Sequence, residues 1–444
     1  MAHHLTDGTL FWPRVRRYAV PPAMIKTATA RRQAGDWAGA CAAARVEVDL
    51  DLGSAKRAYG AAPVTRIRAD LRHLAPDLLR WHLPRTGPDG LLRPALTIPL
   101  ARYDTDGRPL WLVVRTPPAW ADAGQRISLA LWDGDLARDT LARRHPHPHP
   151  SRRFRLDLHR HLWDARRTGE LPDRASADDQ HATRRWPTEA ALLLDAEGLP
   201  AGPVEVRVGG RRGVVDTRET PVGGEAGGGE FEEYGELPRH AVKFTSSPLP
   251  LLPDASTHPL PDLVLLRAGA VEPDALHPLV AEALVPGHAR SSEPASDQAH
   301  RYVDCRGERH RIGLVGGVLS PLDHAPEQLR REELLMALTG TPLPCLRVID
   351  EAHRRPDCLT GVQGRLEHGD TAGALAVVEE LLGPDAVLRD GPLKDALAEA
   401  AERRVVYGLY RAGLSVDAPE RAREGWTGRR QRARRYSRRP EPKR

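Results

Sequence analysis

The sequence is poor in cysteine and lacks any long apolar run. Its four cysteines are Cys41, Cys305, Cys345 and Cys358, and no two of them are spaced as CxxC. Scattered cysteines in a chain of 444 residues exclude a disulfide framework and indicate a reducing cytoplasm. No apolar run approaches the roughly 18 residues that span a bilayer, and the first residues lack the apolar core of a signal peptide. We therefore expect a cytoplasmic protein that does not contact membranes.

The common sequence signatures of catalysis are absent as well. The chain has no GxxxxGK[ST] phosphate loop, no GxSxG nucleophile elbow, no HExxH zinc helix and no EF-hand loop. Its glycine clusters also do not match GxGxxG between a strand and a helix. We therefore predict a protein without catalytic activity, with no catalytic residue, no cofactor and no metal site.

Positive charge is concentrated at the carboxyl end. Residues 429–444 hold nine basic residues and one acidic residue, so this tail carries +8 and the remainder of the chain −3 within a total of +5. Arginine neutralises phosphates, and aromatic rings stack on unpaired bases. The alternative is a disordered terminus that has no partner. The predicted nucleic-acid contacts are Trp426, Arg429, Arg430, Arg432, Arg434, Arg435, Tyr436, Arg438 and Arg439.

A chain of this length exceeds a single core and predicts roughly two to four domains. We expect an α+β multidomain fold with helical hairpins at both ends, antiparallel β elements in the middle and a disordered basic tail. The predicted parts are a mainly helical region at 1–90, an antiparallel β-rich region at 91–217, an acidic Gly-rich flexible loop at 218–240, a small α/β region at 241–324, a helical-hairpin domain at 325–413 and an Arg-rich disordered tail at 414–444.

The amino-terminal region has the pattern of capped helices. Pro21 and Pro22 are predicted to open the first helix, because proline lacks the N–H group that has no partner in a first turn. It is predicted to end before Gly35, and Asp36 caps the next helix. In that second helix the apolar positions from Trp37 to Val48 fall on one face. A further helix carries Val64, Ile67, Leu71 and Leu74 on one side.

Alternating apolar residues predict strands in the middle of the chain. Runs at 96–103, 110–116 and 127–134 are typical of an antiparallel meander, in which Pro99 marks an edge or a break. The sequence further predicts a hairpin at 204–216, strands at 262–266 and over 301–315, and helices at 278–284, 326–339, 343–354, 358–368, 371–382 and 392–412.

The octapeptide GDWAGACA at 35–42 returns as GDTAGALA at 369–376 with six identical positions. Both copies lie where one helical pattern ends and the next begins. These corners look similar to the helical hairpins of tetratricopeptide-like proteins, although no 34-residue period recurs between them. The resemblance implies architecture rather than activity. We interpret the octapeptide as a helix–helix corner, and the alternative is a repeated functional site.

The stretch CLRVIDEAHRR at 345–355 resembles motif II of DEAH-type helicases. In that family the residue matching Asp350 orders Mg²⁺, and the residue matching Glu351 positions the attacking water. This chemistry also requires an upstream phosphate loop, which the chain lacks. We therefore interpret the stretch as part of a helix and predict no ATPase activity.

Two further stretches gather metal-ligating side chains. HPHPHP at 145–150 is predicted to be an extended linker whose histidines point in different directions, with metal binding as the alternative. On the hairpin at 304–313, Asp304, Glu308 and His310 are expected to share one face and to leave Cys305 on the other. A solvated hairpin is the common outcome for such a pattern, and a functional site is the alternative.

Taken together, these patterns predict a scaffold or adaptor protein. Its helical regions would hold a protein partner, and its tail would contact RNA, DNA or a ribonucleoprotein. The alternative is a hydrolase or nuclease with a site in the central β region, near Asp304, Glu308 and His310.

Overall fold

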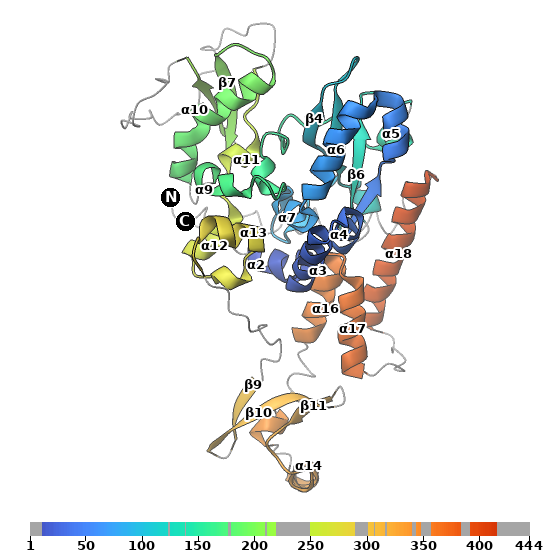
Figure 1. Cartoon of the computed structure of the whole chain (residues 1–444). Coiled ribbons are helices and arrows are strands. Elements are labelled where there is room, and N and C mark those ends of the chain that lie inside the picture. The colour runs from blue at the N-terminus through green and yellow to red at the C-terminus, as the bar shows by residue number, and fades with distance from the viewer. Residues whose placement is uncertain are drawn as a thin grey trace, which may run out of the picture. The chain divides into compact units, whose positions relative to one another are not determined.

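The structure of the chain, a computed structural model whose elements are labelled in Figure 1, separates into two compact units. Unit 1 comprises residues 1–288 and 406–444, and unit 2 comprises residues 289–405. Helices account for 51% of the described residues and strands for 17%, which confirms the predicted mixture of helices with small sheets. The residues described are 11–122, 125–137, 139–175, 179–208, 211–218, 249–288, 301–305, 307–315, 318–339, 343–347, 357–382 and 391–414.

The amino-terminal region of unit 1 is helical, as its capping pattern predicts. α3 (Pro22–Gln33) begins with proline, and α4 (Trp37–Ala43) follows after Gly35, whose φ is +78°. The Asp36 carboxylate caps α4 by accepting a hydrogen bond from Gly39 N at 2.8 Å. The predicted cap is therefore confirmed. Also in this region are α2 (Trp12–Arg14), the π-helical turn η1 (Val15–Ala19), α5 (Leu52–Tyr59), α6 (Ala61–His73) and α7 (Pro76–His82).

One prediction for this region is wrong. The helix predicted from Trp37 to Val48 stops at Ala43, and the strand β1 (Val46–Asp49) follows it. Arg45 has φ +58°, a left-handed conformation that ends the helix. The β-branched valines of β1 then favour a strand, and β1 pairs in parallel with β6. Pairing with a distant strand has therefore overridden the local helical pattern.

A four-stranded sheet with the order β1–β6–β5–β4 lies at the centre of unit 1. β4 (Thr97–Tyr103), β5 (Leu110–Arg115) and β6 (Ile127–Trp132) confirm the predicted antiparallel meander. β4 is an edge strand, and its register shifts between Pro99 and Ala101. Proline cannot donate a ladder hydrogen bond, so an edge position with an irregularity is where it fits.

The main core of unit 1 joins this sheet to the helices α6 and α7, and Figure 1 shows α6 beside β4 and β6. Burying a large apolar side chain contributes about 1.5–3 kcal/mol relative to leaving it exposed. A cluster of this extent therefore fixes the position of each element that it includes. Among its fully buried members are Ile67, Leu71, Leu78, Leu79, Ile98, Leu100, Leu112 and Leu129.

A smaller core in unit 1 joins one helix to a hairpin. α10 (Asp179–Ala196) packs on β7 (Pro203–Val208), which pairs with β8 (Arg211–Asp216). The hairpin predicted over 204–216 is therefore confirmed. The buried members of this smaller core are Ala190, Leu193, Leu194, Val204, Val206 and Leu252.

The stretch 262–266, predicted to be a strand, is instead part of the helix α12 (Pro261–Arg267). Pro261 at its first position suits a helix start, and a short apolar run does not distinguish a strand from a buried helix. The helix predicted at 278–284 is confirmed as α13 (Pro278–Leu284).

The remaining elements of unit 1 are β2 (Arg85–Thr86), β3 (Leu91–Leu92), η2 (Ala119–Ala121), α8 (Thr140–Arg144), η3 (Arg160–Leu162), η4 (Thr168–Glu170), α9 (Leu171–Arg174), α11 (Asp254–Thr257) and η5 (Pro273–Ala275).

Unit 2 contains a three-stranded antiparallel sheet with the order β11–β10–β9. β9 (Arg301–Cys305) and β10 (Glu308–Val315) confirm the predicted strand pair, and β11 (Val318–Pro321) adds a third strand. α14 (Pro326–Thr339) follows and is also confirmed. Residues 344–347 form a further helical turn.

Three more helices of unit 2 share a small core. They are α16 (Asp357–Glu367), α17 (Thr371–Leu382) and the part of α18 (Pro392–Ala412) that precedes residue 406. Each of these helices is predicted from the sequence and confirmed. The buried members of the core are Val362, Leu366, Ala374, Val378 and Ala400.

The second copy of the octapeptide lies at the corner between α16 and α17. Gly369 has φ +81°, and the Asp370 carboxylate accepts a hydrogen bond from Gly373 N at 3.3 Å. This geometry matches the corner at Gly35 and Asp36, so the interpretation of both copies as helix–helix corners is confirmed. The larger arrangement, with separate domains and helical hairpins at both ends, stays a prediction.

The last turns of α18 belong to unit 1. Tyr407 donates its hydroxyl hydrogen to Glu47 Oε2 at 2.8 Å, and Arg411 pairs with both Glu47 and Asp49 of β1. Tyr410 meets Trp120 edge to face with ring centroids 5.4 Å apart. These contacts cover β1, which is one of the two edge strands of the four-stranded sheet.

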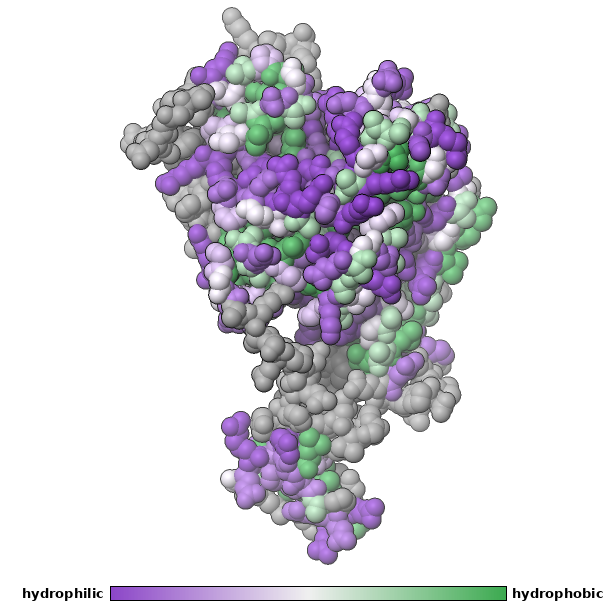
Figure 2. Space-filling view, viewed as in Figure 1, coloured by the Kyte–Doolittle hydropathy of each residue, from purple (hydrophilic) through white to green (hydrophobic). Residues whose placement is uncertain are grey.

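In the part of the chain that the structure describes, no helix combines the length and the apolar character that crossing a bilayer requires. Figure 2 shows hydrophilic side chains gathered over the part of unit 1 that carries α9 and α11.

Candidate metal centre

Four metal-ligating side chains of unit 2 converge on one point. Cys305 ends β9, His310 lies in β10, His324 follows β11, and Cys345 lies in the helical turn at 344–347. Their ligand atoms, two sulfurs and two ring nitrogens, all lie within 4.8 Å of one another. Among the residues described above, this is the one such group of three or more His, Cys, Asp or Glu side chains.

The strand register corrects the arrangement predicted for this hairpin. Glu308 is paired with Cys305, so Cys305 shares a face with Glu308 and, two residues further on, with His310. Asp304 is paired with Arg309 and lies on the opposite face. The prediction assumes that residues with even numbers share one face of the hairpin. Because Cys305 pairs with Glu308, an odd-numbered residue of β9 lies opposite an even-numbered residue of β10, so the assumption fails across the turn. The predicted set of Asp304, Glu308 and His310 therefore does not converge.

The separations between the ligand atoms suit a tetrahedral metal site. Zn–S bonds of about 2.3 Å and Zn–N bonds of about 2.0 Å place neighbouring ligand atoms about 3.3–3.8 Å apart. In the structure His310 Nδ1 lies 2.7 Å from His324 Nε2 and 3.9 Å from Cys345 Sγ. Small side-chain movements therefore bring these atoms to the spacing that a bound ion requires.

The sulfur side of the site is shielded from water. Cys305 and Cys345 are both 0% exposed, and they share an apolar cluster with Leu343. Burial, together with the neighbouring Cys305 thiol, raises the pKa of Cys345 to about 12. The Cys345 sulfur is therefore a neutral thiol at pH 7 until a cation displaces its proton.

The ligand set favours zinc. Two thiolates and two imidazoles are a common combination for Zn²⁺, whereas Mg²⁺ and Ca²⁺ prefer oxygen ligands. All four ligands are protein side chains, so a tetrahedral ion held by them has no position open for water or substrate. Sites of this closed type hold a fold together and do not activate water.

Two of the four ligands are absent from the sequence prediction. Cys305 and His310 belong to the hairpin that the pattern singles out, whereas His324 and Cys345 lie 14 and 35 residues beyond His310. Familiar zinc motifs contain ligand pairs that are roughly two to five residues apart. Here only Cys305 and His310 approach that spacing, and it is the one signal in the sequence for these four ligands.

A buried network in unit 1 has the residue types of a hydrolytic triad. Ser256 Oγ lies 3.0 Å from His159 Nε2 and 3.3 Å from Glu189 Oε2, and Arg174 lies 3.3 Å from His159 Nδ1. Arginine only donates, so His159 Nδ1 accepts and Nε2 carries the hydrogen. His159 therefore donates toward Ser256 and cannot remove its proton. Burial lowers the pKa of His159 to about 4, which keeps the ring neutral.

Arginines in and after η3 of unit 1 are paired with carboxylates. Arg166 lies 2.6 Å from both Asp70 and Asp164, and Arg160 lies 2.8 Å from Asp164. Asp164 is fully buried. These pairs connect α6 to the segment around η3, so Arg160 and Arg166 stabilise the fold.

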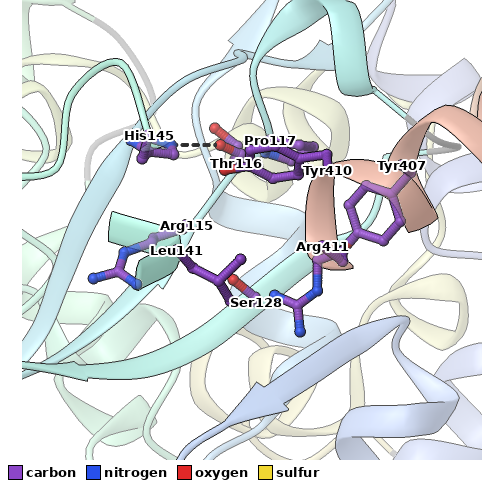
Figure 3. A pocket seen from close by; sticks show the side chains of 9 residues that line it. All are labelled: Arg115, Thr116, Pro117, Ser128, Leu141, His145, Tyr407, Tyr410 and Arg411. Atoms are coloured by element: carbon purple, nitrogen blue, oxygen red, sulfur yellow. Dashed lines mark hydrogen bonds between the residues drawn. The ribbon is translucent and has the colours of Figure 1, made fainter. Parts of the chain in front are cut away.

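Figure 3 shows a hollow in unit 1 that does not have room for a substrate. Arg115, Ser128, His145 and Tyr410 are among its lining residues, and its volume is about 10 Å³. A cavity of that size holds about one water molecule. Arg115 is paired with Asp139 at 2.7 Å, so its charge is already compensated.

The other sequence candidates are placed as follows. In the HPHPHP stretch the two ring nitrogens of His145 each lie 2.9 Å from a backbone oxygen, those of Thr116 and His147, so this ring offers no free ligand atom. Residues 348–356, which include most of the DEAH-like stretch, lie outside the described residues. The same holds for the whole tail from residue 415, with its predicted nucleic-acid contacts, and for the acidic loop from residue 219 to 236.

No protein-family model matches this chain, and comparison with curated proteins and with solved structures gave no match. The functional argument therefore rests on the geometry of the chain itself.

Proposed function

We propose that this chain is a non-enzymatic scaffold or adaptor protein whose unit 2 is organised by one structural Zn²⁺ ion. Cys305, His310, His324 and Cys345 hold the ion. The observation that supports the proposal is the convergence of four protein ligands within 4.8 Å. The helical regions hold a protein partner, and the tail at 429–444 contacts RNA or DNA through its arginines.

The closed ligand set favours a structural ion over the alternative, a hydrolase or nuclease near Asp304, Glu308 and His310. Catalytic zinc sites have three protein ligands and keep a fourth position for water. In this site the fourth ligand is a cysteine, and Asp304 lies on the far face of the hairpin. Glu308 contacts the outer nitrogen of His310, Nε2, and not the inner nitrogen that faces the other ligands, so it lies behind the histidine rather than beside the metal.

A metal ion also adds to the apolar contacts around the site. Among the residues whose side chains the structure describes, the buried cluster there consists of Cys305, Leu343 and Cys345, with Val303 and Leu346 partly buried against it. Small domains with little apolar core commonly need a metal ion or disulfides to fold. Zn²⁺ would join the β9–β10 hairpin, the turn after β11 and the helical turn of Cys345, which are distant in the sequence.

The proposal retains two finer expectations from the sequence. The two units are separate domains, and the chain works in the cytoplasm, where reducing conditions keep the ligand cysteines free to bind metal. Affinity capture from native lysate, with and without nuclease, tests the scaffold role. A partner that persists after nuclease treatment supports a protein contact, and one that disappears supports the nucleic-acid contact.

Metal analysis of the purified full-length protein tests the central claim. We expect about one Zn²⁺ per chain, and Co²⁺ substitution should give the absorption of a tetrahedral site with two thiolates. Cys345→Ser and His310→Ala should each lower the metal content, because each removes a ligand. Cys41→Ala is the matched control, since Cys41 is equally buried but lies in unit 1.

Two results would overturn the metal centre. One is a parent protein that contains no zinc after purification without chelators and does not take it up on addition. The other is unchanged metal content in both ligand variants.

A further inference from the structure

Asp323, the residue before the ligand His324, is bound to β10 through both of its carboxylate oxygens. Oδ2 accepts a hydrogen bond from the backbone N of Arg311 at 2.7 Å, and Oδ1 accepts one from the Arg311 guanidinium at 2.6 Å. The backbone N of Leu322 donates to Arg311 O at 2.8 Å. Arg311 in turn is the residue that follows the ligand His310.

These contacts continue the β10–β11 ladder beyond its last strand pair. The pairing of the two strands ends at Ile312 and Pro321. Beyond Pro321, Leu322 still bonds to Arg311, and the Asp323 carboxylate then takes the place of a strand carbonyl for the Arg311 N–H. The chain therefore stays beside β10 until the residue before His324.

The consequence is that His324 begins next to His310. The two rings meet edge to face with centroids 4.2 Å apart, and His324 is 8% exposed. A side chain on an untethered loop would lose conformational freedom when it binds a metal, and this loss would lower the affinity. The Asp323 contacts restrict that freedom before the ion arrives.

The other histidine is oriented by its strand and by a weaker outer contact. His310 Nδ1 faces His324 and Cys345, while Nε2 lies 3.5 Å from Glu308 Oε2. A carboxylate behind a metal-binding histidine fixes the tautomer that leaves the inner nitrogen free for the ion. Glu308 is largely exposed, so water competes with this contact more than with the Asp323 contacts.

We infer that Asp323 is a positioning residue that holds His324 ready for the metal and so sets the affinity of the site for Zn²⁺. This inference rests on the proposed metal centre. Asp323 is not one of the four side chains whose ligand atoms converge, and its two oxygens face Arg311. Outer residues of this kind typically change metal affinity by about 10–100-fold when they are removed.

The test compares Zn²⁺ affinities of full-length variants by competition with a chromogenic chelator. Asp323→Ala should weaken Zn²⁺ binding by about 10–100-fold. Asp323→Asn should bind more tightly than Asp323→Ala, since the amide oxygen still accepts from Arg311 N. Asp304→Ala is the matched control, because Asp304 precedes the ligand Cys305 but lies on the far face of the hairpin.

The Co²⁺ absorption spectrum distinguishes a positioning role from a ligand role. In Asp323→Ala the spectrum of the saturated protein should match that of the parent, because all four ligands remain. A changed spectrum would make Asp323 a ligand and overturn the inference. Equal affinity of parent and Asp323→Ala would also overturn it while leaving the metal centre intact, whereas a parent that binds no metal would remove the metal centre itself.

Discussion

Arg31 and Asp36 are joined twice across the corner between α3 and α4. The Arg31 guanidinium donates to Asp36 Oδ2 at 3.0 Å, and Arg31 O accepts from Asp36 N at 2.9 Å. Arg365 and Asp370 repeat both contacts at the corner between α16 and α17, each at 2.7 Å. The two corners therefore use the same pair of contacts where one helix ends and the next is capped.

The first prediction concerns these caps. Asp36→Ala and Asp370→Ala should each lower the free energy of unfolding by about 0.5–2 kcal/mol, because a backbone N–H of the next helix loses its acceptor. Denaturant titration of the full chain measures the effect. Asp36→Asn and Asp370→Asn serve as controls, since asparagine is also a good cap, and should have a smaller effect. Alanine variants that unfold like the parent but lose a partner would instead show that the octapeptide is a binding site.

The second prediction concerns a buried ion pair in unit 1. Asp262 is fully buried and accepts from Arg16 at 3.1 Å and from the Trp81 indole N–H at 2.8 Å. Asp262→Asn should destabilise the protein by about 3–5 kcal/mol, because it leaves a buried guanidinium without its counter-charge. Asp216→Asn is the control, because its partner Arg218 is largely exposed, and it should cost far less, since water screens a pair of this kind. Similar losses in the two variants, measured by denaturant titration, would contradict the argument from burial.

The third prediction is a pH dependence that originates in His159. Burial lowers the pKa of this residue from 6.5 to about 4, outweighing the attraction of the Glu189 carboxylate. Between these two values the unfolded chain binds a proton that the folded chain does not, so stability falls as the pH drops from about 6.5 toward 4. The full difference amounts to about 3 kcal/mol.

Denaturant titrations between pH 7 and pH 4 measure this slope. His159→Gln should reduce this slope, because one titrating group is removed, while the buried His161, whose pKa burial also lowers, still contributes with the same sign. His258→Gln, at an exposed position, should keep the parental slope. A His159→Gln protein with the full parental slope would place the pH dependence elsewhere.

The fourth prediction concerns the tail. Ending the chain at Gly428 should lower the affinity for RNA and DNA and reduce its dependence on salt. Each phosphate contact to a single strand contributes a slope of about −0.7 in log affinity against log salt. Fluorescence anisotropy across a salt series measures both quantities. Deletion of 219–236 is a separate arm: if this acidic loop competes for the arginines, its removal tightens binding. Unchanged affinity and slope after truncation would remove the nucleic-acid proposal.

Elements whose signals are local could be predicted from the sequence. Pro22, Gly35 and Asp36 mark where α3 begins, where it ends and where α4 is capped, and each signal acts within one turn of its own position. The alternation in β7 and β8 likewise reports which side chains face the core, whatever the remainder of the chain does.

Elements that depend on distant partners could not be predicted in this way. β1 is a strand because it pairs in parallel with β6, which lies some eighty positions later. The stretch at 262–266 is helical, although its apolar run also suits a strand. The metal centre is the extreme case, because His324 and Cys345 reach Cys305 only through the turn after β11 and the helical turn at 344–347. Where signals were local, as at Cys305 and His310, the pattern found the right hairpin but assigned its faces wrongly.

The contact between β1 and the last turns of α18 has a consequence for synthesis of the chain. Asp49 and Arg411 are 362 residues apart, and translation proceeds at about 5–20 residues per second, so roughly 20–70 seconds separate the appearance of the two residues. During that interval β1 is an edge strand without its cover, the kind of surface on which nascent chains aggregate. Glu47 and Asp49 place negative charge along this edge, and charged side chains on an edge strand oppose pairing with another chain. We therefore expect the same two carboxylates to act at different times, first by protecting an unfinished molecule and then by anchoring the helix that completes it.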